Sequence, residues 1–169
     1  MSISPDEPEN VQDLLVAYAP RVYGLVHRMV GRRDVAEDLM QETLLRAFRG
    51  LKSYQAEGKF RAWIFRIAVN QARDWIRRQR RQAVVSDDPQ PVADAPPDGP
   101  ALARERAQTV EQAMARLSEA DREVLLMRYY GDMAFKEIAQ ATGEPLGTVL
   151  ARAHRALKKL GDLIPEESR

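Results

Sequence analysis

The segment from Phe60 to Arg81, FRAWIFRIAVNQARDWIRRQRR, constrains the fold most, because it contains neither glycine nor proline to interrupt a helix. On a helix that turns by about 100° per residue, its larger apolar residues share one face, which we expect to be buried: Phe60, Trp63, Ile64, Ile67, Ala68 and Trp75. The opposite face carries a row of guanidinium groups that would extend for about 21 Å: Arg66, Arg73, Arg77 and Arg80. Solvated helix faces usually mix their charges, and only Asp74 offsets this row. We therefore predict a polyanion-binding face rather than a merely solvated one.

The distribution of charge supports a localised polyanion site. The net charge is only +1, yet residues 21–83 contain fifteen basic and six acidic residues. The flanking residues 1–20 and 84–103 carry four acids each and no lysine or arginine. A basic block between acidic segments is typical of a chain with one confined anionic partner.

The chain has no cysteine, which excludes disulfides, zinc–thiolate sites and thiol catalysis and fits a reducing cytoplasm. No apolar run approaches the roughly 20 residues of a membrane span. The first ten residues, MSISPDEPEN, are acidic and polar, unlike a signal peptide. We expect a cytoplasmic protein without membrane insertion.

Helical periodicity recurs along the chain, and no alternating strand pattern interrupts it, so the fold class is predicted to be all-α. Asn10 should cap the first helix, Pro20 should end or kink it, and Gly31 should close it. The predicted helices cover residues 11–19, 21–30, 34–51, 60–81, 104–116, 122–130, 134–141 and 146–160.

Residues 84–103 hold five of the ten prolines and four acids, a composition typical of an extended linker. We predict that this flexible acidic linker joins two small helical domains, residues 8–83 and residues 104–162.

The helix at 34–51 has acids crowded into its first half, where they suit the helix dipole. They could equally form a surface for a partner, together with nearby apolar residues. The face predicted to be buried comprises Val35, Leu39, Thr43, Leu44 and Phe48.

The segment AFKEIAQATGEPLGTVLARAHRALKKL has the pattern of a helix-turn-helix, with Ala139 at the helix crossing, Gly143 in the turn and Val149 as an apolar contact. A helical hairpin with a basic surface is the alternative. In the preceding helices the residues predicted to face inward include Val110, Ala113, Met114 and Leu117. In the second helix of the motif they are Leu146, Val149, Ala153, Ala156, Leu157 and Leu160.

These motifs resemble those of an RNA polymerase sigma factor of the extracytoplasmic-function group (ECF, group IV) of the sigma-70 family. Region 2 of that family is similar to DVAEDLMQETLLRAF and FRAWIFRIAVNQARDWIRR, and region 4 is similar to LSEADREVLLMRYYGDMAFKEIA and GTVLARAHRALKKL. The resemblance implies a region 2 helical bundle and a region 4 helix-turn-helix that direct core RNA polymerase to a promoter class. It implies docking on the β′ clamp and β flap, an anti-sigma partner, a monomer when free of partners, and no cofactor or metal.

The resemblance also assigns residues. It places polymerase binding at Asp38, Gln41, Glu42, Leu44, Leu45 and Phe48. It places −10 recognition and melting in the loop before the basic helix and along that helix, at Ser53, Tyr54, Gln55, Lys59, Arg66, Asn70, Arg73, Arg77 and Arg80. Trp63 could act as a wedge between strands, although its position on the apolar face favours the core.

For the −35 element the implied contacts are Arg122, Thr148, Ala151, Arg152, His154, Arg155 and Lys159. The family often has a basic residue and a serine after Gly-Thr-Val, where this chain has Leu150 and Ala151. Leu150 lies at the edge of the apolar face and could be buried. The two substitutions remove polar readout and favour an apolar contact such as a thymine methyl.

Two other functional classes remain open at this point. A helix-turn-helix regulator that binds DNA without polymerase would explain the second domain, but it usually needs a dimer, and no heptad is evident. An enzyme is disfavoured because His27 and His154 lie in separate predicted domains and no Glu-x-x-His, nucleophile-elbow or phosphate-loop motif occurs.

Overall fold

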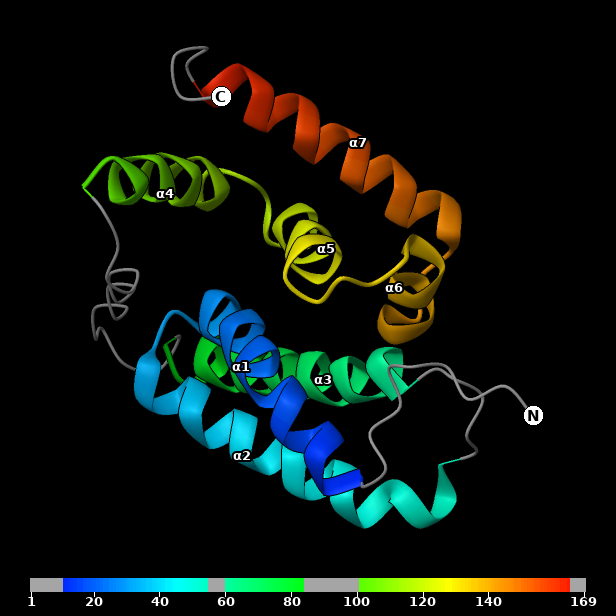
Figure 1. Ribbon diagram of the computed structural model, residues 1–169. Coiled ribbons are helices and arrows are strands. Elements are labelled where there is room, and N and C mark those ends of the chain that lie inside the picture. Colours follow the sequence, from blue (N-terminus) through cyan, green and yellow to red (C-terminus); the bar gives the residue numbers. More distant parts are fainter. Residues whose placement is uncertain (1–10, 55–59, 84–100, 165–169) are drawn as a thin grey trace. The chain divides into compact units, whose positions relative to one another are not determined.

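The computed structural model describes residues 11–54, 60–83 and 101–164, and the regular elements in these ranges are all helical (Figure 1). The chain forms two compact units, Met1–Val92 and Ala93–Arg169. The all-α fold class is therefore confirmed for the described part of the chain. Most of the predicted linker lies outside the described residues, and helix begins at Ala101, inside its predicted range.

The first unit contains α1 (Val11–Val30), α2 (Arg33–Gly50), the short 3₁₀ helix η1 (Leu51–Ser53) and α3 (Phe60–Ala83). Helix α1 runs through Pro20, so of the two predicted alternatives, an end or a kink, Pro20 does not end the helix. Val16, whose carbonyl would have bonded to the missing N–H, is exposed, and water can take that place. Gly31 follows α1 with a φ of 71°, the left-handed conformation predicted for it. The predicted cap Asn10 lies outside the described residues.

The core of the first unit is built where α1, α2 and α3 pack on one another. The largest fully buried side chains of this unit come from α1 and α3: Val22, Leu25, Val26, Ile64, Phe65 and Val69. Helix α3 packs against both other helices, so it buries a wider face than the single row predicted. Phe65, Val69 and Ala72 join its buried side, while Trp63, Ile67 and Trp75 are only half-buried.

The predicted buried face of α2 was partly wrong. Its buried residues are Ala36, Thr43 and Ala47. Phe48 is 51% exposed, and Val35, Leu39 and Leu44 are half-buried. Small side chains face the other helices because α2 contacts both α1 and α3, and their close approach leaves room there only for short residues.

A buried polar connection joins α3 to α2. The Gln71 side-chain amide donates to the Thr43 hydroxyl oxygen at 2.8 Å, and this hydroxyl donates to the Leu39 carbonyl at 2.7 Å. Thr43 is fully buried and Gln71 is 7% exposed. Because a buried polar group is costly unless it is hydrogen-bonded, this connection fixes how α3 sits on α2.

An aromatic cluster holds the start of α3 against its neighbours. Tyr54 lies 5.8 Å from Phe60 and 4.9 Å from Trp63 between ring centroids, and Phe60 lies 5.7 Å from Tyr18 of α1. Gly50 is required here, because a Cβ at this position would come within 2.9 Å of the Trp63 ring. The cluster therefore joins the two ends of the segment 55–59, which itself lies outside the described residues.

The second unit contains α4 (Ala101–Ala115), α5 (Glu119–Tyr129), α6 (Phe135–Thr142) and α7 (Leu146–Leu163). Ser118 caps α5, since its hydroxyl oxygen accepts from the backbone N–H of Asp121 at 3.2 Å. Gly143 has a φ of 71° in the turn between α6 and α7, as the helix-turn-helix pattern predicts.

The core of the second unit centres on Leu117, Leu125 and Ala156, with Met114 and Leu160 packed against it. Three expectations of burial were wrong, because these residues are 39–44% exposed: Val110, Leu146 and Leu157. Leu150, for which the sequence left burial open, is 45% exposed. Helix α7 packs against α5, α6 and α4 on one side only, so its leucines at the margin of that side stay in contact with solvent. Within the described ranges, none of the helices combines the length and hydropathy that a bilayer crossing requires.

Candidate functional site

Helix α2 presents a mixed acidic and apolar surface, here called the α2 patch: Asp38, Gln41, Glu42, Leu44, Leu45 and Phe48. Asp38 and Gln41 are exposed, and Leu45 and Phe48 are 42% and 51% exposed. Glu42 forms an ion pair with Arg46 at 2.6 Å. All the residues predicted for polymerase binding thus lie on one side of one helix, where Glu42 and Leu44 are half-buried.

The position of these acids favours a partner surface over simple complementation of the helix dipole. Dipole effects fall off within the first turn, and Asp34 is the acid in the first turn of α2. Asp34 is held by Arg32 through bonds of 3.1 and 2.5 Å. The hydrogen bonds from Arg32 lower the pKa of the Asp34 carboxyl group below its ordinary value. Asp38 and Glu42 lie one and two turns further along, where the dipole gives little reason for them.

Helix α3 presents its basic row to solvent, as predicted. Arg66, Asn70, Arg77 and Arg80 are exposed, and Arg73 is half-buried. By helical geometry the five side chains fall within about 80° of one another. Arg77 is paired with Asp74 of the same helix. The row is therefore a continuous cationic edge on the face of α3 away from its core.

The residues predicted in the loop before α3 are only partly described. Ser53 ends η1, and Tyr54 is half-buried in the aromatic cluster. Gln55 and Lys59 lie outside the described residues. Trp63 is half-buried against Tyr54 and Phe60, which places it among core contacts as the sequence favoured.

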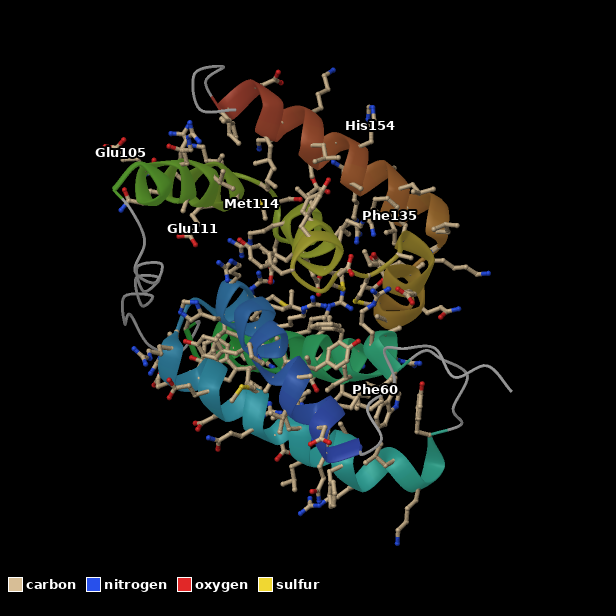
Figure 2. The ribbon with its side chains drawn as sticks, viewed as in Figure 1. Phe60, Glu105, Glu111, Met114, Phe135 and His154 are labelled. Carbon is tan, nitrogen blue, oxygen red and sulfur yellow. The ribbon has the colours of Figure 1, made fainter. Side chains whose placement is uncertain are left out.

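In the second unit, the helix-turn-helix geometry is as predicted. Ile138 and Ala139 of α6 and Val149 of α7 are buried. Outside this contact, Thr148, Ala151 and His154 are exposed along α7, and Figure 2 shows His154 projecting away from its unit. The outer face of α7 is thus accessible to a partner, including Leu150, which is 45% exposed rather than buried.

Several cations predicted to contact DNA have partners within the unit. Arg152 pairs with Glu144 in the turn. Arg155 donates to both carboxylate oxygens of Asp121, at 2.9 and 2.6 Å. Lys159 is held as well, since its ammonium group donates to the Arg116 carbonyl at 2.7 Å. The remaining predicted cation, Arg122, is half-buried.

Sequence reasoning missed Asp121 and Glu144 as partners of these cations. Hydrogen bonds from Arg155 hold the pKa of the Asp121 carboxyl group below its ordinary value. Asp121 could not be identified as a partner from sequence, because Arg155 lies 34 positions away. Glu144 follows Gly143 in the turn. Its position about two helical turns before Arg152 was the one signal in the sequence that could have indicated this ion pair.

The histidines give no sign of a metal centre. His27 stacks on Tyr23 at 5.6 Å between centroids, and His154 is exposed. In the portion of the chain that the structure describes, no three His, Cys, Asp or Glu residues are grouped to hold a metal ion.

Comparison with known proteins places both units in one family. Residues 14–82 match the model of sigma-70 region 2, and residues 107–160 match the model of sigma-70 region 4. The RNA polymerase sigma factor CarQ of Myxococcus xanthus is 35% identical over 92% of this chain and 89% of its own. The ECF RNA polymerase sigma factor SigW of Bacillus subtilis is 30% identical over 88% of this chain and 85% of its own.

Among solved structures, the sigma factor RpoE of Bartonella quintana, in complex with the anti-sigma factor NepR, has a TM-score of 0.79. It is 25% identical, and the match covers 92% of this chain and 97% of RpoE. CnrH, solved with the cytosolic domain of CnrY, shares the fold with a TM-score of 0.65 and 23% identity. With both sigma-70 regions present in order and relatives matched over most of their length, the chain belongs to the extracytoplasmic-function sigma factors of the sigma-70 family.

Proposed function

We propose that the chain is a sigma subunit in which α2 binds polymerase, α3 recognises the −10 element and α7 recognises the −35 element. Residues 8–83 act as region 2, residues 104–162 as region 4, and residues 84–103 as the linker between them. The α2 patch docks on the β′ clamp of core RNA polymerase, and region 4 docks on the β flap. The observation that carries this proposal is that α2 and α3 expose surfaces of opposite character on one packed unit: an acidic and apolar patch, and a cationic row.

The cationic row on α3 serves best as a track for a separated strand of the −10 element. A displaced strand needs cations along its backbone and groups that hold unstacked bases. Asn70 lies within the row of arginines and offers both a hydrogen-bond donor and an acceptor. Residues 53–59 would form the pocket for a flipped base, with Ser53, Tyr54, Gln55 and Lys59 as its polar groups. The aromatic cluster beside this loop fixes the angle at which α3 leaves it.

Helix α7 enters the major groove at the −35 element. In helix-turn-helix proteins the N-terminal part of the second helix lies against base edges, and Thr148 and Ala151 are exposed in that part of α7. The methyl groups of Thr148 and Ala151 suit contact with thymine. We expect a −35 preference with few bidentate base contacts.

The chain works in the cytoplasm and is itself non-catalytic, since its role is to bind polymerase and promoter. An anti-sigma factor is expected to hold it inactive. This expectation is supported by the similarity to RpoE of Bartonella quintana, whose structure was solved with the anti-sigma factor NepR.

The test is run-off transcription with core RNA polymerase and genomic promoter fragments, followed by mapping of start sites. We expect start-specific transcripts that core polymerase alone does not give. The absence of such transcripts would refute the proposal, while specific duplex binding by the free chain would favour a polymerase-independent regulator.

Two double variants test the division of labour. Arg73→Ala with Arg77→Ala should leave polymerase binding near normal and abolish opening of the −10 region, measured by permanganate reactivity of unpaired thymines. Asp38→Ala with Gln41→Ala should weaken polymerase binding first, measured by competition for core enzyme. Equal behaviour of the two variants in both assays would show that the division is wrong.

A further inference from the structure

On the outward face of α7, Arg155 forms an ion pair with Asp121 of α5 through two parallel hydrogen bonds, an arrangement here called the fork. Arg155 donates from Nε and Nη2 to the two carboxylate oxygens of Asp121 on α5. The Asp121 side chain is 7% exposed, whereas the Arg155 side chain is 61% exposed. The backbone N–H of the same Asp121 is capped by Ser118. The fork therefore connects the start of α5 to the middle of α7.

The chemistry of the fork opposes a role for Arg155 in binding phosphate. A planar guanidinium matches a carboxylate through two parallel bonds, and Arg155 uses two of its N–H groups in this way. A DNA phosphate would have to approach a cation already neutralised by Asp121. Drawing Arg155 away would leave a nearly buried carboxylate without its partner, which is strongly unfavourable.

Two further cations of α7, on either side of Arg155, also bond to other parts of the second unit. Arg152, one turn earlier, pairs with Glu144, and Lys159, one turn later, donates to the last turn of α4 at the Arg116 carbonyl. These three cations fix α7 to the turn, to α5 and to α4. Within the described second unit, exposed Lys158 forms no hydrogen bond or ion pair, and it lies on the same side of α7 as exposed His154.

We infer that Arg155 is a positioning residue, which sets α7 on α5 through Asp121, and that Thr148, Ala151, His154 and Lys158 form the surface that faces DNA. This inference rests on the proposed function of α7 in reading the −35 element. It reassigns Arg155, which the sequence pattern predicted as a DNA contact, and adds Lys158, which the pattern did not select.

The experiment measures the salt dependence of promoter binding by the reconstituted holoenzyme on a promoter fragment obtained from the start-site mapping. Neutralising one duplex phosphate contributes about 0.9 to the slope of log K against log salt concentration. The variants are Arg155→Gln, Asp121→Asn and their combination. Lys158→Gln is the matched control, because it also removes one cation from α7.

For a positioning residue, Arg155→Gln and Asp121→Asn should each weaken promoter binding by similar factors, up to about fivefold. The combination should be no weaker than either change alone, and the salt slope should stay at its wild-type value. Lys158→Gln should lower the slope by about 0.9. Arg155→Lys, which keeps the charge but loses the fork, should resemble Asp121→Asn and remains informative if that variant folds poorly.

The inference is overturned if Arg155→Gln lowers the slope as Lys158→Gln does while Asp121→Asn binds as well as or better than wild type. That outcome would mean that Arg155 contacts phosphate, and it would leave the proposed function intact. A wild-type chain that gives no start-specific transcript overturns the proposed function, and the inference fails with it.

Discussion

Replacement of Thr43 by valine tests how α3 is held on α2. The two side chains have nearly the same shape, so packing is kept, but the acceptor for the Gln71 amide is lost. Gln71 is 7% exposed, so water has little access to its N–H group. Leaving such a group without a partner costs about 1–3 kcal/mol. For a unit of this size each kcal/mol corresponds to a fall in Tm of about 4–8 °C.

The assay is urea unfolding followed by tryptophan fluorescence. The chain has two tryptophans, and both Trp63 and Trp75 lie on α3, so the signal reports on the first unit. Gln71→Met should cost less, about 0.5–1.5 kcal/mol, because the Thr43 hydroxyl keeps its bond to the Leu39 carbonyl. The double variant should be closer to wild type than the sum of the single changes predicts.

Two results would contradict this reasoning. One is a Thr43→Val variant whose free energy of unfolding stays within about 0.5 kcal/mol of wild type, the range of an ordinary surface change. The other is strict additivity of the two changes, since side chains that bond directly should show a coupling of about 0.5–3 kcal/mol.

Three further predictions concern other surfaces of the molecule. Gly143→Ala should destabilise the second unit by about 1–2 kcal/mol, because a φ of 71° disfavours a side chain even though open space surrounds the Cβ position; thermal unfolding followed by circular dichroism measures this. Phe48→Ser should leave folding unchanged but weaken polymerase binding by about tenfold or more in a competition assay, and an unchanged affinity would remove Phe48 from the α2 patch. The folded-state pKa of Asp121 is lowered from 3.8. The contribution of the ionised carboxylate to stability is therefore present above pH 3.8 and is lost as pH falls through the lower folded-state pKa. In denaturant titrations below about pH 5, the free energy of unfolding should fall less steeply with pH for Asp121→Asn than for wild type.

Local rules were sufficient for the helices and the turns. The uninterrupted run of α3 and the glycines at positions 31 and 143 could be interpreted from sequence, because helix propensity and left-handed turns depend on neighbouring residues. Burial was harder to predict. On α2, Phe48 was expected inside, yet the small residues Ala36 and Ala47 are buried, because the close approach of two other helices decides which side is covered.

In the candidate site too, features set by neighbouring residues could be predicted and features set by packing between helices could not. Exposure of the acids in the α2 patch and of most of the α3 row could be predicted from periodicity and charge, whereas exposure of Phe48 could not. The partners of the α7 cations could not, since periodicity identifies a basic face but does not show which of its members bond to another helix. Arg155 and Asp121 are 34 positions apart, and only the packing of α7 on α5 brings them together.

The aromatic cluster at the start of α3 has a consequence for how this protein can diversify. Ring contacts join Tyr54 directly to Phe60 and Trp63, so the two ends of the intervening segment are held together by side chains outside it. The entropy of closing a loop then changes only slowly with its length, and the ring contacts that hold the two ends involve no residue between them. Residues 55–59 can therefore accumulate substitutions or insertions at little cost to the first unit, which makes this segment the place where a new promoter preference can arise most readily.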